Sequence, residues 1–167
     1  MQEKGTEGRH VNHEHWLKEA IQLAKDNVAR GHGGPFGAVI VRNGEMIGLG
    51  VNETTITHDP TAHAEIQAIR QACRRLGTST LDGAVLYASG EPCPMCLAAA
   101  YWANVQAIYV ACPKSEAAKV GFADKMASFF ADLQKAPETR DIPVHTLMVE
   151  GYLDPFLLWK NDQHPSD

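Results

Sequence analysis

The chain has 167 residues, long enough for one well-packed domain and too short for two, and its 44% apolar and 21% charged residues are typical of globular proteins. Its formal net charge of −5 argues against nucleic-acid binding, which draws on clustered Lys and Arg, and favours a small-molecule substrate. No stretch approaches a membrane span and residues 1–15 are too polar for a signal peptide, so we expect a cytoplasmic protein with no membrane partner.

The N-terminal part of the chain predicts a helix followed by a hairpin. Apolar side chains at helical spacing predict a helix over residues 13–30, and the glycine-rich turn at 31–35 ends it. Residues 36–41 and 46–51 are strand-like, and Asn43-Gly44 between them supplies the positive φ angles that a tight hairpin turn requires.

A second helix is expected from Asp59, as N-cap, with Pro60 in its first turn, to Gly77 at its C-terminal end. Beyond it the patterns alternate between extended and helical. They predict a strand at 84–89, a helix at 94–103, a strand at 107–111, a weaker helical region at 115–135, a strand at 144–150 and a short helix at 155–161.

Strands separated by helical segments of this length imply right-handed crossovers and a sheet covered on both faces. The expected architecture is therefore a three-layer α/β/α sandwich around a five-stranded mixed sheet. We expect residues 13–167 to form a single domain and residues 1–12 to be a disordered segment before the first helix.

Two short strings carry the chemistry. His63-Ala64-Glu65 and Cys93-Pro94-Met95-Cys96 lie about thirty residues apart and match the known pattern of zinc-dependent nucleobase deaminases. One imidazole and two thiolates can hold Zn²⁺ and leave its fourth position for water or hydroxide, while a carboxylate that is not a ligand moves protons. Both strings fall at expected helix N-termini, where the partial positive charge favours the thiolate form of cysteine.

The cysteines allow other interpretations. A Cys-x-x-Cys pair at a helix start could be a redox pair or part of a purely structural zinc site. His63 and Glu65 in register with that pair favour the catalytic site. Cys73 and Cys112 lie in apolar stretches, so we interpret both as buried structural residues.

Longer strings resemble the bacterial guanine deaminases, a branch of the cytidine deaminase superfamily, from about residue 13 to residue 161. The zinc pattern alone identifies only the superfamily, whereas Tyr101-Trp102 and the string at 121–124 are typical of this branch. The strings that carry the resemblance are Gly33-Gly34-Pro35-Phe36-Gly37-Ala38-Val39-Ile40-Val41, Asn52, Asp59-Pro60-Thr61-Ala62-His63-Ala64-Glu65, Glu91-Pro92-Cys93-Pro94-Met95-Cys96, Tyr101-Trp102-Ala103, Gly121-Phe122-Ala123-Asp124 and Pro155-Phe156.

The resemblance implies hydrolysis of guanine to xanthine and ammonia. It assigns one zinc per chain to His63, Cys93 and Cys96, and proton transfer from zinc-bound water to Glu65, with Asp124 assisting the departure of ammonia. Spacing alone does not place His63 and Glu65 at one metal, because residues two apart on a regular helix point in different directions.

The resemblance also implies which residues bind the base. It assigns hydrogen bonds with the base to Asn52, the backbone N–H of Ala64 and the carboxylate of Asp124, and walls of the pocket to Phe36 and Trp102. An acceptor at Asp124 suits guanine, which presents N1–H and an amino group, and would face the acceptor N1 of adenine unfavourably.

The sequence also allows other substrates and other functions. Transfer-RNA adenosine, cytidine and aminated triazines are handled by related zinc sites, and an inactive binding member of the fold is a further alternative. The resemblance implies a homodimer whose C-terminal segment can exchange between subunits, although no Tyr follows Asn161 at the end of the chain.

Overall fold

The computed structural model describes residues 12–122 and 126–163, with the side chains of residues 162 and 163 excepted. The chain divides into two compact units, Met1–Met126 and Ala127–Asp167. The expected disordered segment, apart from residue 12, and Asp124 lie outside the described residues. In the described part, no helix combines the length and the apolar character needed to cross a membrane.

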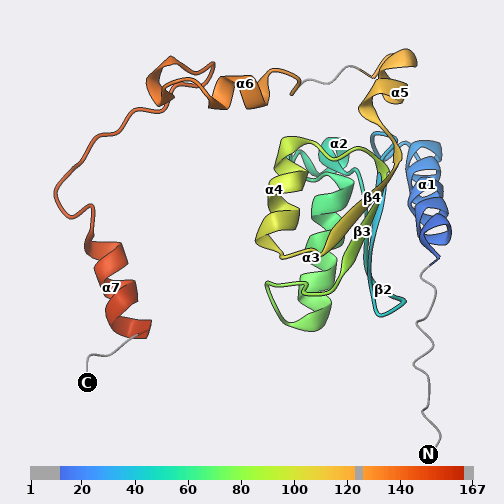
Figure 1. Ribbon diagram of the computed structural model, residues 1–167, viewed down its shortest axis with the longest axis horizontal. Helices are drawn as coiled ribbons and strands as arrows, with labels where there is room; N and C mark the ends of the chain where they lie inside the picture. Colours follow the sequence, from blue (N-terminus) through green and yellow to red (C-terminus); the bar gives the residue numbers. More distant parts are fainter. Residues whose placement is uncertain (1–11, 123–125, 164–167) are drawn as a thin grey trace, which may run out of the picture. The chain divides into compact units, whose positions relative to one another are not determined.

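The first unit is built on a mixed sheet of four strands in the order β2-β1-β3-β4 (Figure 1). Its strands are β1 (Gly37–Arg42), β2 (Glu45–Val51), β3 (Val85–Gly90) and β4 (Ala107–Cys112). β1 runs antiparallel to both β2 and β3, and β3 runs parallel to β4. The predicted hairpin is confirmed, with Asn43 and Gly44 at φ 55° and 77°.

Helices cover both faces of this sheet, so the expected three layers are confirmed. α1 (His13–Ala29) packs against β1 and β3 on one face, where Val39, Val41 and Tyr87 form the core. α3 (Ala64–Leu76) and α4 (Pro94–Trp102) lie on the other face. Two short helices, α2 (Thr54–Thr57) and α5 (Lys114–Lys119), complete the unit.

Two glycines of β2 let α3 approach the sheet closely. A Cβ added at Gly50 would lie 2.2 Å from the carbonyl oxygen of Ala64, and one added at Gly48 would lie 2.5 Å from that of Ala68. Both contacts are with helix backbone, so only glycine fits at this distance. The close packing fixes the N-terminus of α3, which carries the first predicted site residues.

The expected fifth strand at 144–150 is absent from the structure, where these residues are exposed and pair with no strand. A strand needs a hydrogen-bonded neighbour, and the described part of residues 127–163 contains none. That unit instead holds α6 (Phe129–Leu133), a short 3₁₀ turn (Pro137–Thr139) and α7 (Asp154–Gln163). The helical region expected at 115–135 is therefore split between α5 and α6.

Candidate active site

The candidate metal ligands stand at the N-termini of the two neighbouring helices α3 and α4. His63 is the N-cap of α3 and Cys93 the N-cap of α4, and neither side chain caps its own helix. Cys96 follows in the first turn of α4, with Pro94 at the position where its missing N–H costs nothing. The His63 imidazole and the Cys93 thiol are therefore available to contact a shared metal ion.

The turn before His63 differs from the prediction. Asp59 does not cap α3; its Oδ1 accepts hydrogen bonds from the backbone N–H and the hydroxyl of Thr61, at 2.7 and 2.6 Å. These donors hold the pKa of the Asp59 carboxyl below its usual value. An Asp side chain that binds the backbone two residues on forms a turn rather than a helix start, so α3 begins later, at Ala64.

The three ligand atoms form a triangle of the size that zinc requires. The Sγ atoms of Cys93 and Cys96 lie 3.6 Å apart, and His63 Nδ1 lies 3.6 Å from the first and 3.5 Å from the second. Zn–S and Zn–N bonds of about 2.3 and 2.0–2.1 Å at tetrahedral angles give edges of about 3.8 and 3.6 Å. The donor set and its spacing therefore fit zinc.

The charges of the cluster also favour a cation. Donation from Cys96 and from His63 lowers the pKa of Cys93 to about 4, so this thiolate exists without metal. The pKa of Cys96 is raised strongly, because its thiol donates to Cys93 and because it is buried beside Glu65. The hydrogen bond to Cys93 in turn raises the pKa of His63. A second thiolate at Cys96 requires a nearby positive charge, which a dication supplies.

Glu65 lies beside the ligands and is 7% exposed. Burial raises the pKa of its carboxyl, and donation from the Cys96 thiol and the charge of His63 only partly oppose that effect. A carboxyl group whose pKa is raised by burial can accept a proton and return it.

A cavity of about 370 Å³ opens next to this cluster. Phe36 and Phe122 meet edge to face in its wall, with ring centroids 6.0 Å apart. Sequence reasoning did not assign Phe122 to the pocket, although it lies two residues before Asp124 in a string that carries the family resemblance. The lining residues are Phe36, Asn52, His63, Glu65, Gly90, Glu91, Cys93, Cys112, Lys114, Ala117, Phe122 and Met126.

Asn52 is 7% exposed and is held from several sides. Its Oδ1 accepts from the hydroxyl of Thr54 at 3.0 Å and from the backbone N–H of Gly34 at 3.3 Å. Its carbonyl oxygen accepts from Asn27 Nδ2 at 2.8 Å. Asn52 lines the cavity, and these contacts give its side-chain amide a defined orientation.

Three further residues singled out from the sequence, Ala64, Trp102 and Cys112, differ in their position relative to the cavity. Ala64 is the first residue of α3, so its N–H is among the helix donors without an intrahelical acceptor. Trp102 is the last residue of α4, is 87% exposed, and does not line the cavity. Cys112, interpreted from the sequence as a buried structural residue, is half-buried and lines the cavity.

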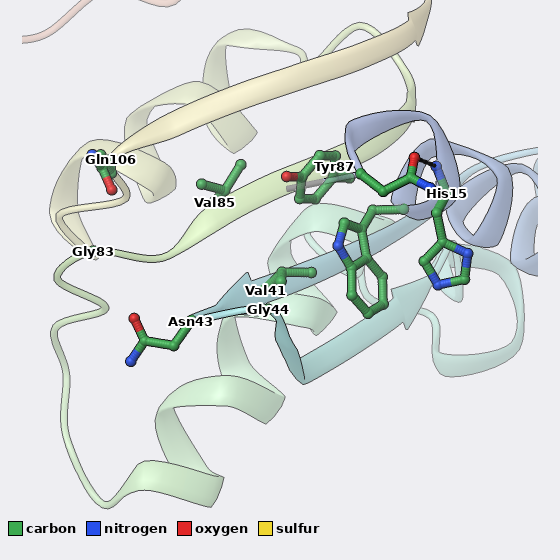
Figure 2. Close-up of a pocket in the computed structure, with 10 residues that line it drawn as sticks. His15, Val41, Asn43, Gly44, Gly83, Val85, Tyr87 and Gln106 are labelled. Atoms are coloured by element: carbon green, nitrogen blue, oxygen red, sulfur yellow. Dashed lines mark hydrogen bonds between the residues drawn. The ribbon is translucent and has the colours of Figure 1, made fainter. Parts of the chain in front are cut away.

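A second hollow, of about 700 Å³, lies near the start of α1 and the β1–β2 turn (Figure 2). Among its lining residues are Trp16, Tyr87 and Gln106, and none of the predicted site residues lines it. Among the described residues, only His63, Cys93 and Cys96 form a group that could hold a metal. The smaller cavity is therefore the candidate active site, because the chemistry is there.

The family model for the cytidine and deoxycytidylate deaminase zinc-binding region matches residues 10–112. The chain belongs to this family of zinc-binding deaminases. Over nearly its whole length it is similar to the guanine deaminase of Bacillus subtilis (strain 168), with 47% identity over 151 residues, or 90% of this chain and 96% of the relative. A crystal structure of guanine deaminase from Bacillus subtilis matches with a TM-score of 0.83 and covers 90% of this chain and 94% of that one.

Two further relatives match less of the chain. The tRNA-specific adenosine deaminase of Aquifex aeolicus (strain VF5) is 48% identical over 83 residues, 50% of this chain and 54% of the relative. A structure of guanine deaminase from Nitrosomonas europaea matches with a TM-score of 0.61 and 30% identity over 71% of each chain.

Proposed function

We propose that the chain is a zinc-dependent guanine deaminase, which hydrolyses guanine to xanthine and ammonia. The observation that carries this proposal is the triangle of His63, Cys93 and Cys96 beside buried Glu65, at a cavity of about 370 Å³. The similarity to the Bacillus subtilis guanine deaminase extends over 90% of this chain, whereas the tRNA-specific relative matches half of it.

The proposed cofactor is one zinc ion per chain, held by His63, Cys93 and Cys96. When bound, zinc would act as a Lewis acid and would lower the pKa of a bound water molecule toward about 7. Two thiolates and a neutral imidazole make the complex formally neutral. The positive ends of α3 and α4 stabilise the two thiolates.

Glu65 moves the protons of the reaction. Its carboxylate takes a proton from the attacking water, whose oxygen forms a bond to C2 of guanine, and returns that proton to a ring nitrogen. The bond from C2 to the amino nitrogen then breaks, and ammonia leaves after a further proton transfer, with which Asp124 assists. The raised pKa of Glu65 suits both halves of this task.

The base is recognised by hydrogen bonds of fixed direction. Asn52 Nδ2 and the N–H of Ala64 donate to the acceptors of guanine, and Asp124 accepts from its N1–H and amino groups. Phe36 provides an aromatic wall. A wall from Trp102 stays a prediction, since this side chain lies outside the cavity of the single chain. Adenine, with an acceptor at N1, is mismatched with Asp124.

The test is ammonia release by purified, zinc-loaded protein. Guanine, adenine, cytosine, their nucleosides, aminated triazines and transfer RNA are supplied in separate reactions. We expect strong release from guanine and little from the others. Activity confined to cytidine or transfer RNA would overturn the substrate, and absence of release from every compound would point to a binding protein without catalysis.

We also propose that the enzyme is a homodimer and that residues 13–167 act as one deaminase domain within it, with the C-terminal segment exchanged between subunits. Support comes from the exposed apolar side chains of the C-terminal unit, which include Leu147, Phe156 and Trp159. The four free cysteines suit a reducing compartment, and we place the enzyme in the cytoplasm. Light scattering after size-exclusion chromatography should give twice the mass of the chain.

A further inference from the structure

The amide of Asn52 has two ends of opposite hydrogen-bonding character, and its orientation decides which end a ligand meets. Gly34 contributes a backbone N–H, which can only donate, so the group facing it must be the acceptor Oδ1. The hydroxyl of Thr54 donates to the same oxygen. Because Oδ1 accepts both of these hydrogen bonds, Nδ2 is the atom of the amide that can donate to a ligand in the cavity.

Thr54 is the stronger of the two anchors. Its hydroxyl lies 3.0 Å from Asn52 Oδ1, while the Gly34 nitrogen lies at 3.3 Å, beyond the usual limit of about 3.2 Å for an N–H···O bond. The main chain of Asn52 is fixed separately, because its N–H donates to the carbonyl of Phe36 and its carbonyl accepts from Asn27. Loss of the Thr54 hydroxyl would therefore free the side-chain amide and leave the backbone in place.

We propose that Thr54 is a positioning residue that locks the Asn52 amide with its donor end toward the cavity, and so favours a purine with a carbonyl at C6 over one with an amino group there. The inference rests on the proposed function, in which Asn52 contacts the base. Guanine carries at C6 the carbonyl oxygen O6, an acceptor that suits Nδ2. A freely rotating amide would offer Oδ1 to an amino group equally well.

The experiment measures affinities of the zinc-loaded, full-length protein for hypoxanthine and adenine by calorimetry. Both purines lack the 2-amino group that the reaction removes, and they differ at C6 and N1. Thr54→Val removes the hydroxyl at nearly constant shape, whereas Thr54→Ser retains it. We expect Thr54→Val to lower the preference for hypoxanthine by roughly 5- to 10-fold, the effect of about one neutral hydrogen bond. Thr54→Ser should keep the preference of the parent.

Two controls distinguish an effect of Thr54 on the Asn52 amide from a general loss of structure. Thr57 lies in the same short helix and its hydroxyl donates to the carbonyl of Glu53 at 2.6 Å, away from Asn52. Thr57→Val should leave the preference unchanged. With Asn52→Ala already present, Thr54→Val should have no further effect on the preference.

The outcomes distinguish the two proposals. Absence of guanine deamination by the parent chain would refute the proposed function. The ratio of the affinities for hypoxanthine and adenine would still test whether Thr54 orients the Asn52 amide. An unchanged ratio in Thr54→Val, or a changed ratio that persists with Asn52→Ala present, would overturn the role of Thr54.

Discussion

At the scale of single residues, Glu65 is a carboxyl group in a place where its charge is costly. Burial raises its pKa, so the folded protein binds this proton more tightly than the unfolded chain does. By linkage, stability of the metal-free protein falls as the pH rises from the unfolded pKa through the folded pKa. The cost is fully present above the folded pKa and disappears in acid, where Glu65 is protonated in both states.

Glu65→Gln should therefore have two separable effects. Turnover should fall by about 10²- to 10⁴-fold, the usual contribution of a positioned proton carrier, while zinc stays bound. In the presence of a chelator, the variant should unfold at higher urea concentration than the parent at neutral pH, and this difference should shrink as the pH is lowered. Retained turnover would remove Glu65 from its role, and a stability difference that grows in acid would contradict the raised pKa.

The ligand triad predicts how zinc affinity depends on pH. Near neutral pH Cys93, with a pKa of about 4, is ionised, whereas Cys96, with a raised pKa, loses a proton when the metal binds. Affinity should fall about tenfold per pH unit as the pH is lowered, and more steeply once His63 is protonated as well. Competition with a chromophoric chelator between pH 6 and pH 8 measures the slope. An affinity independent of pH would rule out Cys96 as a ligand that enters as a thiol.

At the scale of elements, the placement of α3 depends on a contact between backbones. An alanine at Gly50 would put its Cβ 2.2 Å from the carbonyl oxygen of Ala64 and push the start of the helix off the sheet. Gly50→Ala should cost about 1–3 kcal/mol of stability, as overpacking does, and should weaken zinc binding through His63. Urea unfolding and chelator competition measure the two effects.

Gly44→Ala is the matched control for this prediction. Gly44 has a φ of 77° and open space around it, so an added Cβ strains the turn without touching α3. The control should lose stability and keep its zinc affinity. Equal zinc affinities for Gly50→Ala and the parent would show that the glycine contact does not position the site.

Local signals explain which elements the sequence could predict. Asn43-Gly44 forms its hairpin turn with neighbouring residues, and the apolar periodicity of 13–30 predicts a helix whose observed bounds, His13–Ala29, differ by one residue. The predicted start of α3 at Asp59 was wrong, because an Asp side chain can either cap a helix or form a turn. The hydrogen bonds that Asp59 accepts from Thr61 favour the turn. The short α2 (Thr54–Thr57) lacks an apolar period and was missed.

For the site as well, local patterns in the sequence could be predicted, whereas features that depend on distant packing could not. His63, Cys93 and Cys96 could be proposed as ligands because metal sites need particular residue types at particular spacings, and the structure brings their donor atoms within 3.6 Å of one another, where they could hold a metal. The strand expected at 144–150 depends on a pairing partner distant in sequence, and periodicity cannot supply one. The same holds for Trp102, whose surroundings depend on packing between elements rather than on its own helix.

At the scale of the whole molecule, the C-terminal unit exposes many large apolar side chains. Exposed side chains of residues 127–161 include Ile142, Leu147, Met148, Phe156 and Trp159. Many exposed apolar side chains in one segment are typical of segments that pack against another surface. In a dimer with exchanged C-terminal segments, each active site would combine the cavity of one chain with the tail of its partner.

Mixing two variant chains tests this exchange, once each variant has been measured alone and found inactive. One chain carries Glu65→Gln and an intact tail, and the other carries Phe156→Ser with Trp159→Ser and an intact cavity. If tails are exchanged, a mixed dimer has one complete site, so random reassortment of equal amounts should restore about a quarter of the parent activity. If each tail serves its own chain, no mixed dimer contains a complete site and the mixture should stay inactive. Reassortment itself is checked by mass, with one chain carrying an affinity tag, so that inactivity in proven mixed dimers would refute the exchange.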